Sequence, residues 1–148
     1  MTIGTPSIGF IGGGNMAQAI IGGLLRAGVP ARQLAVAEPD DGCRHRLAAL
    51  AAGMRLTAAN HEVAALADVL VLAVKPQVMP AVLAGLASQQ RPPGQLVMSV
   101  AAGMPVASIT AALGANTAVV RVMPNQPATV GAGMSVLVAS PAVNAGQR

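Results

Sequence analysis

The sequence predicts an α/β fold, a doubly wound and mostly parallel β-sheet with helices on both faces, formed by one domain over residues 1–148. Three observations lead to this prediction. Strand and helix signals alternate along the whole chain. The apolar runs are short and are separated by turn residues, which is typical of strands buried on both faces of a parallel sheet. A glycine-rich turn joins the first predicted strand to the first predicted helix.

The first half of the chain predicts three strand–helix units followed by a fourth strand. Gly28 and Pro30 end the first helix, and Gly53 ends the second. The fourth strand is the strongest in the sequence, a β-branched and leucine-rich run that ends before Lys75 and Pro76. The strands predicted here are residues 7–11, 33–37, 54–56 and 69–74, and the helices are residues 15–27, 41–52 and 62–66.

The second half continues the alternation. Pro105 suits the first turn of a helix, because a proline there costs no backbone hydrogen bond, and Gly114 ends that helix. The strands predicted here are residues 96–100, 118–122 and 135–138, and the helices are residues 78–87 and 105–113.

The last residues predict the start of one more helix. Ser140 suits an N-cap and Pro141 the first helical position, and only seven residues follow. A helix of that length is marginal in water unless it packs on something. We therefore expect a domain truncated near its C-terminal end, the front part of a longer protein.

Composition argues against a membrane span and against export. The chain is 53% hydrophobic with a mean hydropathy of +0.60, but its longest apolar run, residues 63–74, is too short to cross a bilayer and contains Asp68. No Lys or Arg precedes Arg26, so the N-terminus lacks the cationic segment of a signal peptide. We expect a cytoplasmic protein with no membrane partner.

The reactive and charged residues exclude further classes. Cys43 is the single cysteine, and with only His45 and His61 as further soft ligands no disulfide or metal site is expected. The net charge of +4 comes from eight arginines and one lysine that are scattered along the chain, and Phe10 is the only aromatic residue. Nucleic-acid binders usually show clustered charge or stacking rings, so we expect a small anionic ligand instead.

The glycine-rich turn matches the pattern G-x-G-x-x-A at Gly12, Gly14 and Ala17, between a strand and a helix. This context is typical of a Rossmann-type dinucleotide-binding turn. Gly12 allows the tight turn, Gly14 lets the backbone approach a pyrophosphate and Ala17 keeps the helix close to the strand, whereas Gly13 is predicted to be replaceable. The free N–H groups of the first helical turn then face the phosphates. The alternative is an ordinary turn in a chain with 17 glycines.

The same fingerprint requires an acidic residue about 20 positions further on, for the ribose hydroxyls of the cofactor. Glu38 stands there, followed by Asp40, and this rule predicts NAD. Arg44 and Arg46 lie one turn into the next predicted helix, where they either meet the 2′-phosphate of NADP or form a solvated helix face. The sequence leaves NAD and NADP both open.

Three loops follow successive strands, at the edge where open α/β sheets bind ligands. They contain Lys75 and Pro76, then the small residues 99–103, then Asn125 between two prolines. His45 and His61 are expected at helix starts away from this edge and solvated. No complete catalytic set is present, so the catalytic residues stay unknown.

Four stretches together resemble pyrroline-5-carboxylate reductases over about residues 7 to 140. They are IGFIGGGNMAQAIIGGL, ADVLVLAVKPQ, VMSVAAGMP and VVRVMPNQPATVGAGMS, in this order. The resemblance implies a Rossmann domain that holds NADP or NAD in reduced form, with a C-terminal helical domain that forms a homo-oligomer and supplies much of the substrate pocket. It also implies reduction of the ring C=N bond of 1-pyrroline-5-carboxylate to L-proline, with this fragment alone inactive.

The resemblance also implies cofactor contacts along the carboxyl edge. They fall in four groups: the pyrophosphate at Ile11, Gly12, Gly13, Gly14, Asn15 and Met16; the adenosine end at Glu38 and Asn60; the length of the cofactor at Ala73, Val74, Lys75 and Pro76; and the nicotinamide at Val100, Ala101, Ala102 and Asn125. Glu38 departs from the small or basic residue common at its position in the family. Two alternatives stay open, another NAD(P)-dependent dehydrogenase of the β-hydroxyacid type and a non-catalytic dinucleotide-binding module.

Overall fold

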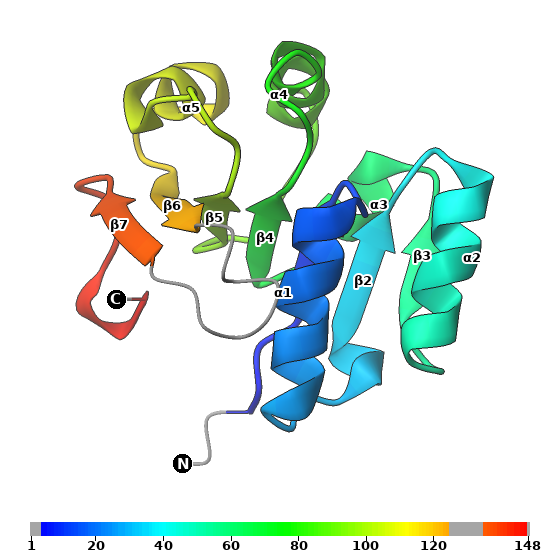
Figure 1. Ribbon diagram of the computed structural model, residues 1–148. Coiled ribbons are helices and arrows are strands. Elements are labelled where there is room, and N and C mark those ends of the chain that lie inside the picture. Colours follow the sequence, from blue (N-terminus) through cyan, green and yellow to red (C-terminus); the bar gives the residue numbers. More distant parts are fainter. Residues whose placement is uncertain (1–3, 125–134, 148) are drawn as a thin grey trace.

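The computed structural model describes residues 4–124 and 135–147, and within them one seven-stranded sheet organises the chain (Figure 1). The strand order is β3-β2-β1-β4-β5-β6-β7, with all neighbours parallel except β6 and β7. The strands are β1 (Ile8–Ile11), β2 (Leu34–Ala37), β3 (Arg55–Thr57), β4 (Val69–Leu72), β5 (Leu96–Ser99), β6 (Ala118–Pro124) and β7 (Ser135–Ala139). The predicted doubly wound, mostly parallel Rossmann-type sheet is confirmed.

Helices cover both faces of the sheet. α1 and α2 lie on one face, while α3, α4 and α5 lie on the other (Figure 1). The helices are α1 (Asn15–Arg26), α2 (Asp41–Leu50), α3 (Asn60–Ala64), α4 (Met79–Ala87) and α5 (Val106–Leu113), with short 3₁₀ turns at Ala31–Gln33 and Ala145–Gln147. Each predicted strand and helix up to residue 139 is present, with ends shifted by one or two residues in most cases.

The core forms two layers because each central strand buries both faces. On the α1 and α2 side, Phe10 is fully buried with Val36 and Leu47. On the other side, Leu70 and Val97 pack under α3, α4 and α5. These strands alternate between the two layers without a solvent face, which explains why they are apolar throughout.

Polar side chains tie the amino ends of the strands together. Asp68 accepts hydrogen bonds from the backbone N–H of Ser7 at 2.9 Å and from its hydroxyl at 2.8 Å, which joins the starts of β1 and β4. Gln95 is buried, and its Nε2 donates to the carbonyls of Ala64 and Ala67, both at 2.8 Å. Ala64 is the last residue of α3, where a helix leaves its last acceptors without internal partners, and Ala67 lies in the turn that follows.

The predicted helix at Ser140 and Pro141 is wrong. A turn followed by the 3₁₀ segment stands there, and no α-helix begins between residues 139 and 147. The Ser140 hydroxyl is buried and accepts from the N–H of Val119 at 3.0 Å, and it donates to the carbonyl of Thr117 at 3.2 Å. The side chain that would cap a helix is therefore bonded to β6 and the residue before it.

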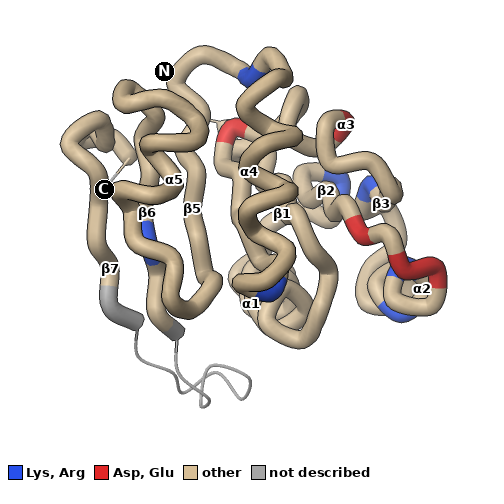
Figure 2. Tube along the Cα trace, turned by 90° about the horizontal axis from the view of Figure 1, so that it is seen from above, with Lys and Arg blue, Asp and Glu red and all other residues tan. Residues whose placement is uncertain are grey.

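Charge is distributed unevenly over the fold. Figure 2 shows α4 and α5 without Lys, Arg, Asp or Glu, while side chains of both charges gather at α2.

Among the described residues, no helix combines the length and apolarity needed to cross a membrane.

Candidate functional site

The order in which successive strands join the sheet reverses between the parallel neighbours β1 and β4, and this switch point positions the site. From β1 the chain proceeds outward to β2 and β3, whereas from β4 it proceeds in the opposite direction to β5 and β6. The connections above β1 and β4 therefore diverge and leave a crevice at the carboxyl ends of the strands, the place where such sheets bind ligands.

A groove of about 350 Å³ occupies this crevice. It brings together seven of the residues singled out from the sequence, from the connections that follow β1, β2, β3 and β4. Its lining residues are Gly12, Gly14, Ala37, Glu38, Pro39, Ala58, Asn60, Ala73, Val74, Lys75, Val78 and Val82. The lining is mostly apolar, with the Glu38 carboxylate, the Asn60 amide and the Lys75 ammonium as its side-chain polar groups. Such walls suit a flat ring system with a few directed polar contacts.

The first glycine of the turn is required by its backbone. Gly12 has φ +95°, a conformation that side chains strongly disfavour, and an added Cβ would lie 2.7 Å from the carbonyl oxygen of Ala73. The absence of a side chain thus allows β1 to turn tightly against the end of β4.

Gly14 has a different role. Its φ of −73° is open to any residue, and an added Cβ would meet nothing within 4 Å. Gly14 lines the groove, so this empty space belongs to the site. The helix α1 begins directly after it without a side-chain cap, which leaves the first N–H groups of a twelve-residue helix unbonded by any side chain.

Gly13, which the sequence pattern leaves replaceable, is crowded on the side that faces the core. An added Cβ would lie 2.6 Å from Cδ1 of Leu47 and 3.2 Å from Cγ1 of Val36, both fully buried. Gly13 packs downward onto the core on the α2 side, and the sequence pattern gives no sign of this because the constraint comes from a helix 30 residues away.

Three side chains hold the Gly13 residue in place. Its N–H donates to Oε2 of Glu38 at 2.8 Å. Its carbonyl accepts from Nε2 of Gln18 at 2.9 Å and from the thiol of the buried Cys43 at 3.0 Å. Sequence reasoning missed Gln18 and Cys43, because neither belongs to the glycine pattern and Cys43 reaches Gly13 only after α2 packs beside the turn.

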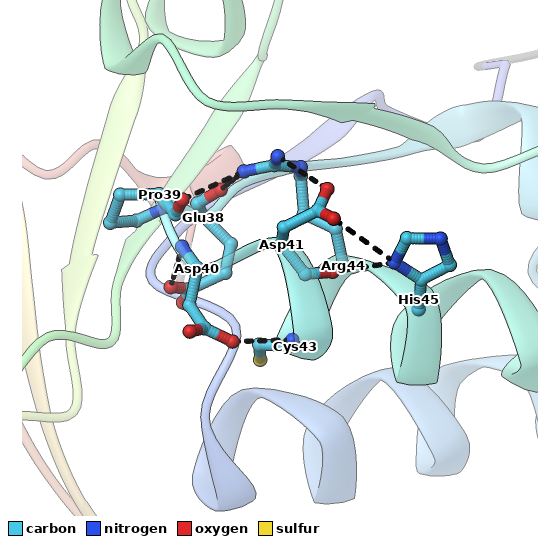
Figure 3. Close-up of polar contacts among 7 residues, drawn as sticks. All are labelled: Glu38, Pro39, Asp40, Asp41, Cys43, Arg44 and His45. Carbon is cyan, nitrogen blue, oxygen red and sulfur yellow. Dashed lines mark hydrogen bonds and ion pairs between the residues drawn. The ribbon is translucent and has the colours of Figure 1, made fainter.

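The Glu38 carboxylate is held at the lip of the groove by a second bond, since its Oε1 accepts from the N–H of Asp40 at 3.0 Å (Figure 3). Arg44 folds back onto the same turn. Its Nη1 donates to the carbonyl oxygens of Glu38 at 2.6 Å and Pro39 at 2.9 Å, and its Nη2 donates to Oδ1 of Asp41 at 2.9 Å. The solvated-face alternative for Arg44 does not hold, because this side chain braces the loop that carries Glu38.

The remaining predicted contacts among the described residues lie along the same edge but outside the groove. Ile11 is fully buried and Ala101 nearly so, and the N–H of Val100 donates to the carbonyl of Leu72 at 3.1 Å, which continues the β4–β5 ladder. Ala102 and Pro76 are exposed at the ends of their strands. Asn15 and Met16 open α1, and Asn125 lies outside the described residues.

Sequence reasoning also missed part of the groove wall. Pro39, Ala58, Val78 and Val82 line it without belonging to any motif. Pro39 and Ala58 follow the ends of β2 and β3 directly, whereas Val78 and Val82 belong to the start and the first turn of α4, so position alone would have pointed to them.

The histidine prediction needs one correction. His45 and His61 lie near the starts of α2 and α3, and these starts face the carboxyl edge rather than away from it. Both are exposed and neither lines the groove, so the expected solvation stands. Within residues 4–124 and 135–147, no cluster of three or more His, Cys, Asp or Glu is arranged to hold a metal ion.

A second cavity, of about 420 Å³, lies at the opposite edge of the sheet, beside the loops before β5 and β6. Arg91 lines it, and burial lowers the pKa of that guanidinium below its ordinary value. This cavity contains none of the predicted site residues and faces no helix N-terminus of the parallel sheet. We therefore place the candidate site in the smaller groove.

The groove residues fit a dinucleotide. The empty space at Gly14 and the uncapped start of α1 match a pyrophosphate, which needs close backbone approach and N–H donors. The Glu38 carboxylate keeps lone pairs beyond its two backbone bonds for a pair of ribose hydroxyls. Ala58, Val74 and Val78 provide apolar wall for the rings.

Known proteins share these features. Residues 7–103 match the family model described as NADP oxidoreductase, coenzyme F420-dependent. The pyrroline-5-carboxylate reductase of Pseudomonas aeruginosa is 48% identical over 143 residues, which are 97% of this chain and 52% of that protein.

Two solved structures have the same fold. A pyrroline-5-carboxylate reductase from Coxiella burnetii superposes with a TM-score of 0.89 at 35% identity, over 97% of this chain and 53% of that one. The Plasmodium falciparum pyrroline carboxylate reductase, solved with NADP bound, superposes with a TM-score of 0.80 over 99% of this chain and 52% of that one. Its identity is 24%, so it shows the fold alone.

The chain spans about half the length of the curated relatives it matches. It belongs to the family described as NADP oxidoreductase, coenzyme F420-dependent, and over that half it resembles the pyrroline-5-carboxylate reductases.

Proposed function

We propose that this chain is the cofactor-binding portion of a pyrroline-5-carboxylate reductase, which reduces 1-pyrroline-5-carboxylate to L-proline with NADH or NADPH. The observation that carries the proposal is the groove at the switch point between β1 and β4, where Gly14 leaves open space beside the uncapped start of α1. The 48% identity to the Pseudomonas aeruginosa reductase supports the choice of substrate.

Each part of the groove has one task in this function. Gly12 and Gly14 admit the pyrophosphate, Glu38 accepts from the adenosine ribose and Asn60 lies beside it at the same end. Ala73, Val74 and Lys75 continue the wall past β4 toward β5. The bound nicotinamide supplies a hydride for the carbon of the substrate's C=N bond.

The groove contains no histidine and, besides Glu38 and Lys75, no ionisable side chain. Glu38 is bonded to the backbone of Gly13 and Asp40, which suits a binding group rather than a proton donor. A substrate that arrives with its imine nitrogen already protonated needs no strong acid from this half. The remaining substrate contacts then come from a C-terminal helical domain through which the complete enzyme forms a homo-oligomer in the cytoplasm.

A chimera tests this function. The chain replaces the matching half of the Pseudomonas aeruginosa reductase, and proline formation is measured with NADH and with NADPH. We expect activity from the chimera and loss of that activity on Gly14→Val, while the 148-residue chain alone binds cofactor without turnover. A folded chimera that binds NAD(P)H but never reduces pyrroline-5-carboxylate would contradict the proposed substrate. Activity on a 3-hydroxyacid instead would favour the β-hydroxyacid type of dehydrogenase.

A further inference from the structure

The turn after β2 concentrates negative charge at the adenosine end of the groove. Glu38, Asp40 and Asp41 place three carboxylates within four residues (Figure 3). Glu38 is held over the groove by the N–H groups of Gly13 and Asp40. Asp40 accepts from the N–H of Cys43 at 2.6 Å and caps α2, while Asp41 is largely exposed.

The nearest cation is already engaged. The Arg44 side chain is only 24% exposed, and its terminal nitrogens donate to two backbone carbonyls and to Asp41. If these donors turned to a phosphate, the loop that holds Glu38 would lose its hydrogen bonds from Arg44. Arg46 is exposed two residues further along α2, and Lys75 lines the groove at the end of β4, two strands away from β2.

The ribose subsite therefore presents a fixed carboxylate and a turn with excess negative charge. A ribose with free 2′ and 3′ hydroxyls donates to such a carboxylate. A 2′-phosphate adds nearly two negative charges and offers only acceptors, so it meets like charge, and three of the five N–H donors of Arg44 are already bonded to the turn.

We infer, on the basis of the proposed function, that this groove selects the dinucleotide that lacks a 2′-phosphate, so that NADH is preferred over NADPH. The selection comes from Glu38 as a specificity residue and from Arg44, which holds the turn instead of binding phosphate. It contrasts with the family description as an NADP oxidoreductase and with the NADP-bound Plasmodium falciparum structure, which shares 24% identity.

The first measurement is equilibrium binding of NADH and NADPH to the 148-residue chain by fluorescence titration at constant ionic strength. We expect the dissociation constant of NADPH to be at least tenfold higher than that of NADH. Equal affinities, or tighter NADPH, would overturn the inference and leave the proposed function standing. Binding of neither nucleotide would overturn the proposed function itself.

The second measurement assigns the selection to named residues. Glu38→Gln removes the charge at nearly constant shape, and we expect the ratio of the two dissociation constants to fall at least fivefold. Glu62→Gln is the matched control, because Glu62 lies on α3 outside the groove and pairs with Arg55 at 3.7 Å. It should leave the ratio unchanged.

A third variant protects the test against a folding defect in Glu38→Gln. The Asp41 side chain is 75% exposed, so Asp41→Ala should fold normally while it removes the acceptor that holds Nη2 of Arg44. We expect it to strengthen NADPH binding about threefold and to leave NADH unchanged. If both variants weaken or strengthen the two nucleotides equally, the acidic turn has only a structural role and the inference fails.

Discussion

At the scale of single residues, the glycine turn shows that neighbouring glycines serve different purposes. Gly12 has a positive φ, Gly13 lies against the core beneath it and Gly14 faces empty space above it. The sequence pattern singled out the first and third. It could not identify the second, because Leu47 and Val36 reach Gly13 only after α2 packs on the sheet.

Gly14→Val should weaken cofactor binding at a small cost in stability. The added side chain enters space that the protein leaves empty, so the free energy of unfolding should fall only by the loss of a favourable helix N-cap, about 1 kcal/mol. The dissociation constants of NADH and NADPH should rise at least about tenfold, which corresponds to about 1.4 kcal/mol. Fluorescence titration and urea unfolding measure the two effects.

The matched control is Gly85→Ala in α4, where an added Cβ also meets nothing within 4 Å but lies outside the groove. It should stabilise the fold by about 0.5 to 1 kcal/mol, since alanine favours a helix interior more than glycine does. Its nucleotide affinities should equal those of the unchanged protein. A parallel loss of affinity in both variants would remove the special role of Gly14.

Gly13→Ala should have the opposite profile. The added methyl group collides with the buried Leu47 side chain, and overpacking of a core costs about 1 to 3 kcal/mol. Urea unfolding should show this loss. A stability equal to that of the unchanged protein would mean that Leu47 has room to move, and that Gly13 is replaceable after all.

At the scale of elements, the helices are anchored by buried polar groups that no local pattern reveals. Gln95 precedes β5, yet it bonds to the end of α3, about 30 residues earlier in the chain. Gln95→Leu should destabilise the fold by about 2 kcal/mol, because two buried carbonyls lose their donor.

Gln90→Leu is the control for this change, since Gln90 is exposed, and its effect should stay within about 0.5 kcal/mol. Chemical denaturation measures both variants. If Gln95→Leu is as stable as Gln90→Leu, water replaces the amide at the end of α3, and the proposed anchoring role of Gln95 is wrong.

Element positions were largely predictable, and the failures have a common cause. Gly114 and Pro105 bound α5 as expected, because local backbone preferences decide such ends. Ser140 failed because its hydroxyl bonds to the neighbouring strand instead of capping a helix. In the site, the spacing singled out Glu38, whereas the bond from Cys43 to Gly13 depends on how α2 packs beside the glycine turn.

At the scale of the whole molecule, the sheet has an apolar edge. Leu137 is 65% exposed and Val138 is 51% exposed on β7, the last strand in the sheet order. An exposed edge strand without charge is a template for pairing with another chain.

Leu137→Lys should therefore reduce association of the concentrated chain and leave its thermal midpoint nearly unchanged, because the side chain already lies in solvent. Sedimentation velocity over a concentration series measures the association. Leu66→Lys, at a residue that is 51% exposed near the end of α3, is the control and should have no effect. Equal changes in both variants would point to net charge and not to the strand edge.

The neighbours of β1 also determine when the fold can form. Ile8 pairs with Leu34 on one side and with Val69 on the other, so the second partner lies 61 residues along the chain. Such non-local pairing slows folding, since a long loop must close before any contact compensates for it. During synthesis, the edge of β1 that pairs with β4 therefore stays unpaired until β4 has left the ribosome. The groove forms only after that, because residues that follow both strands line it.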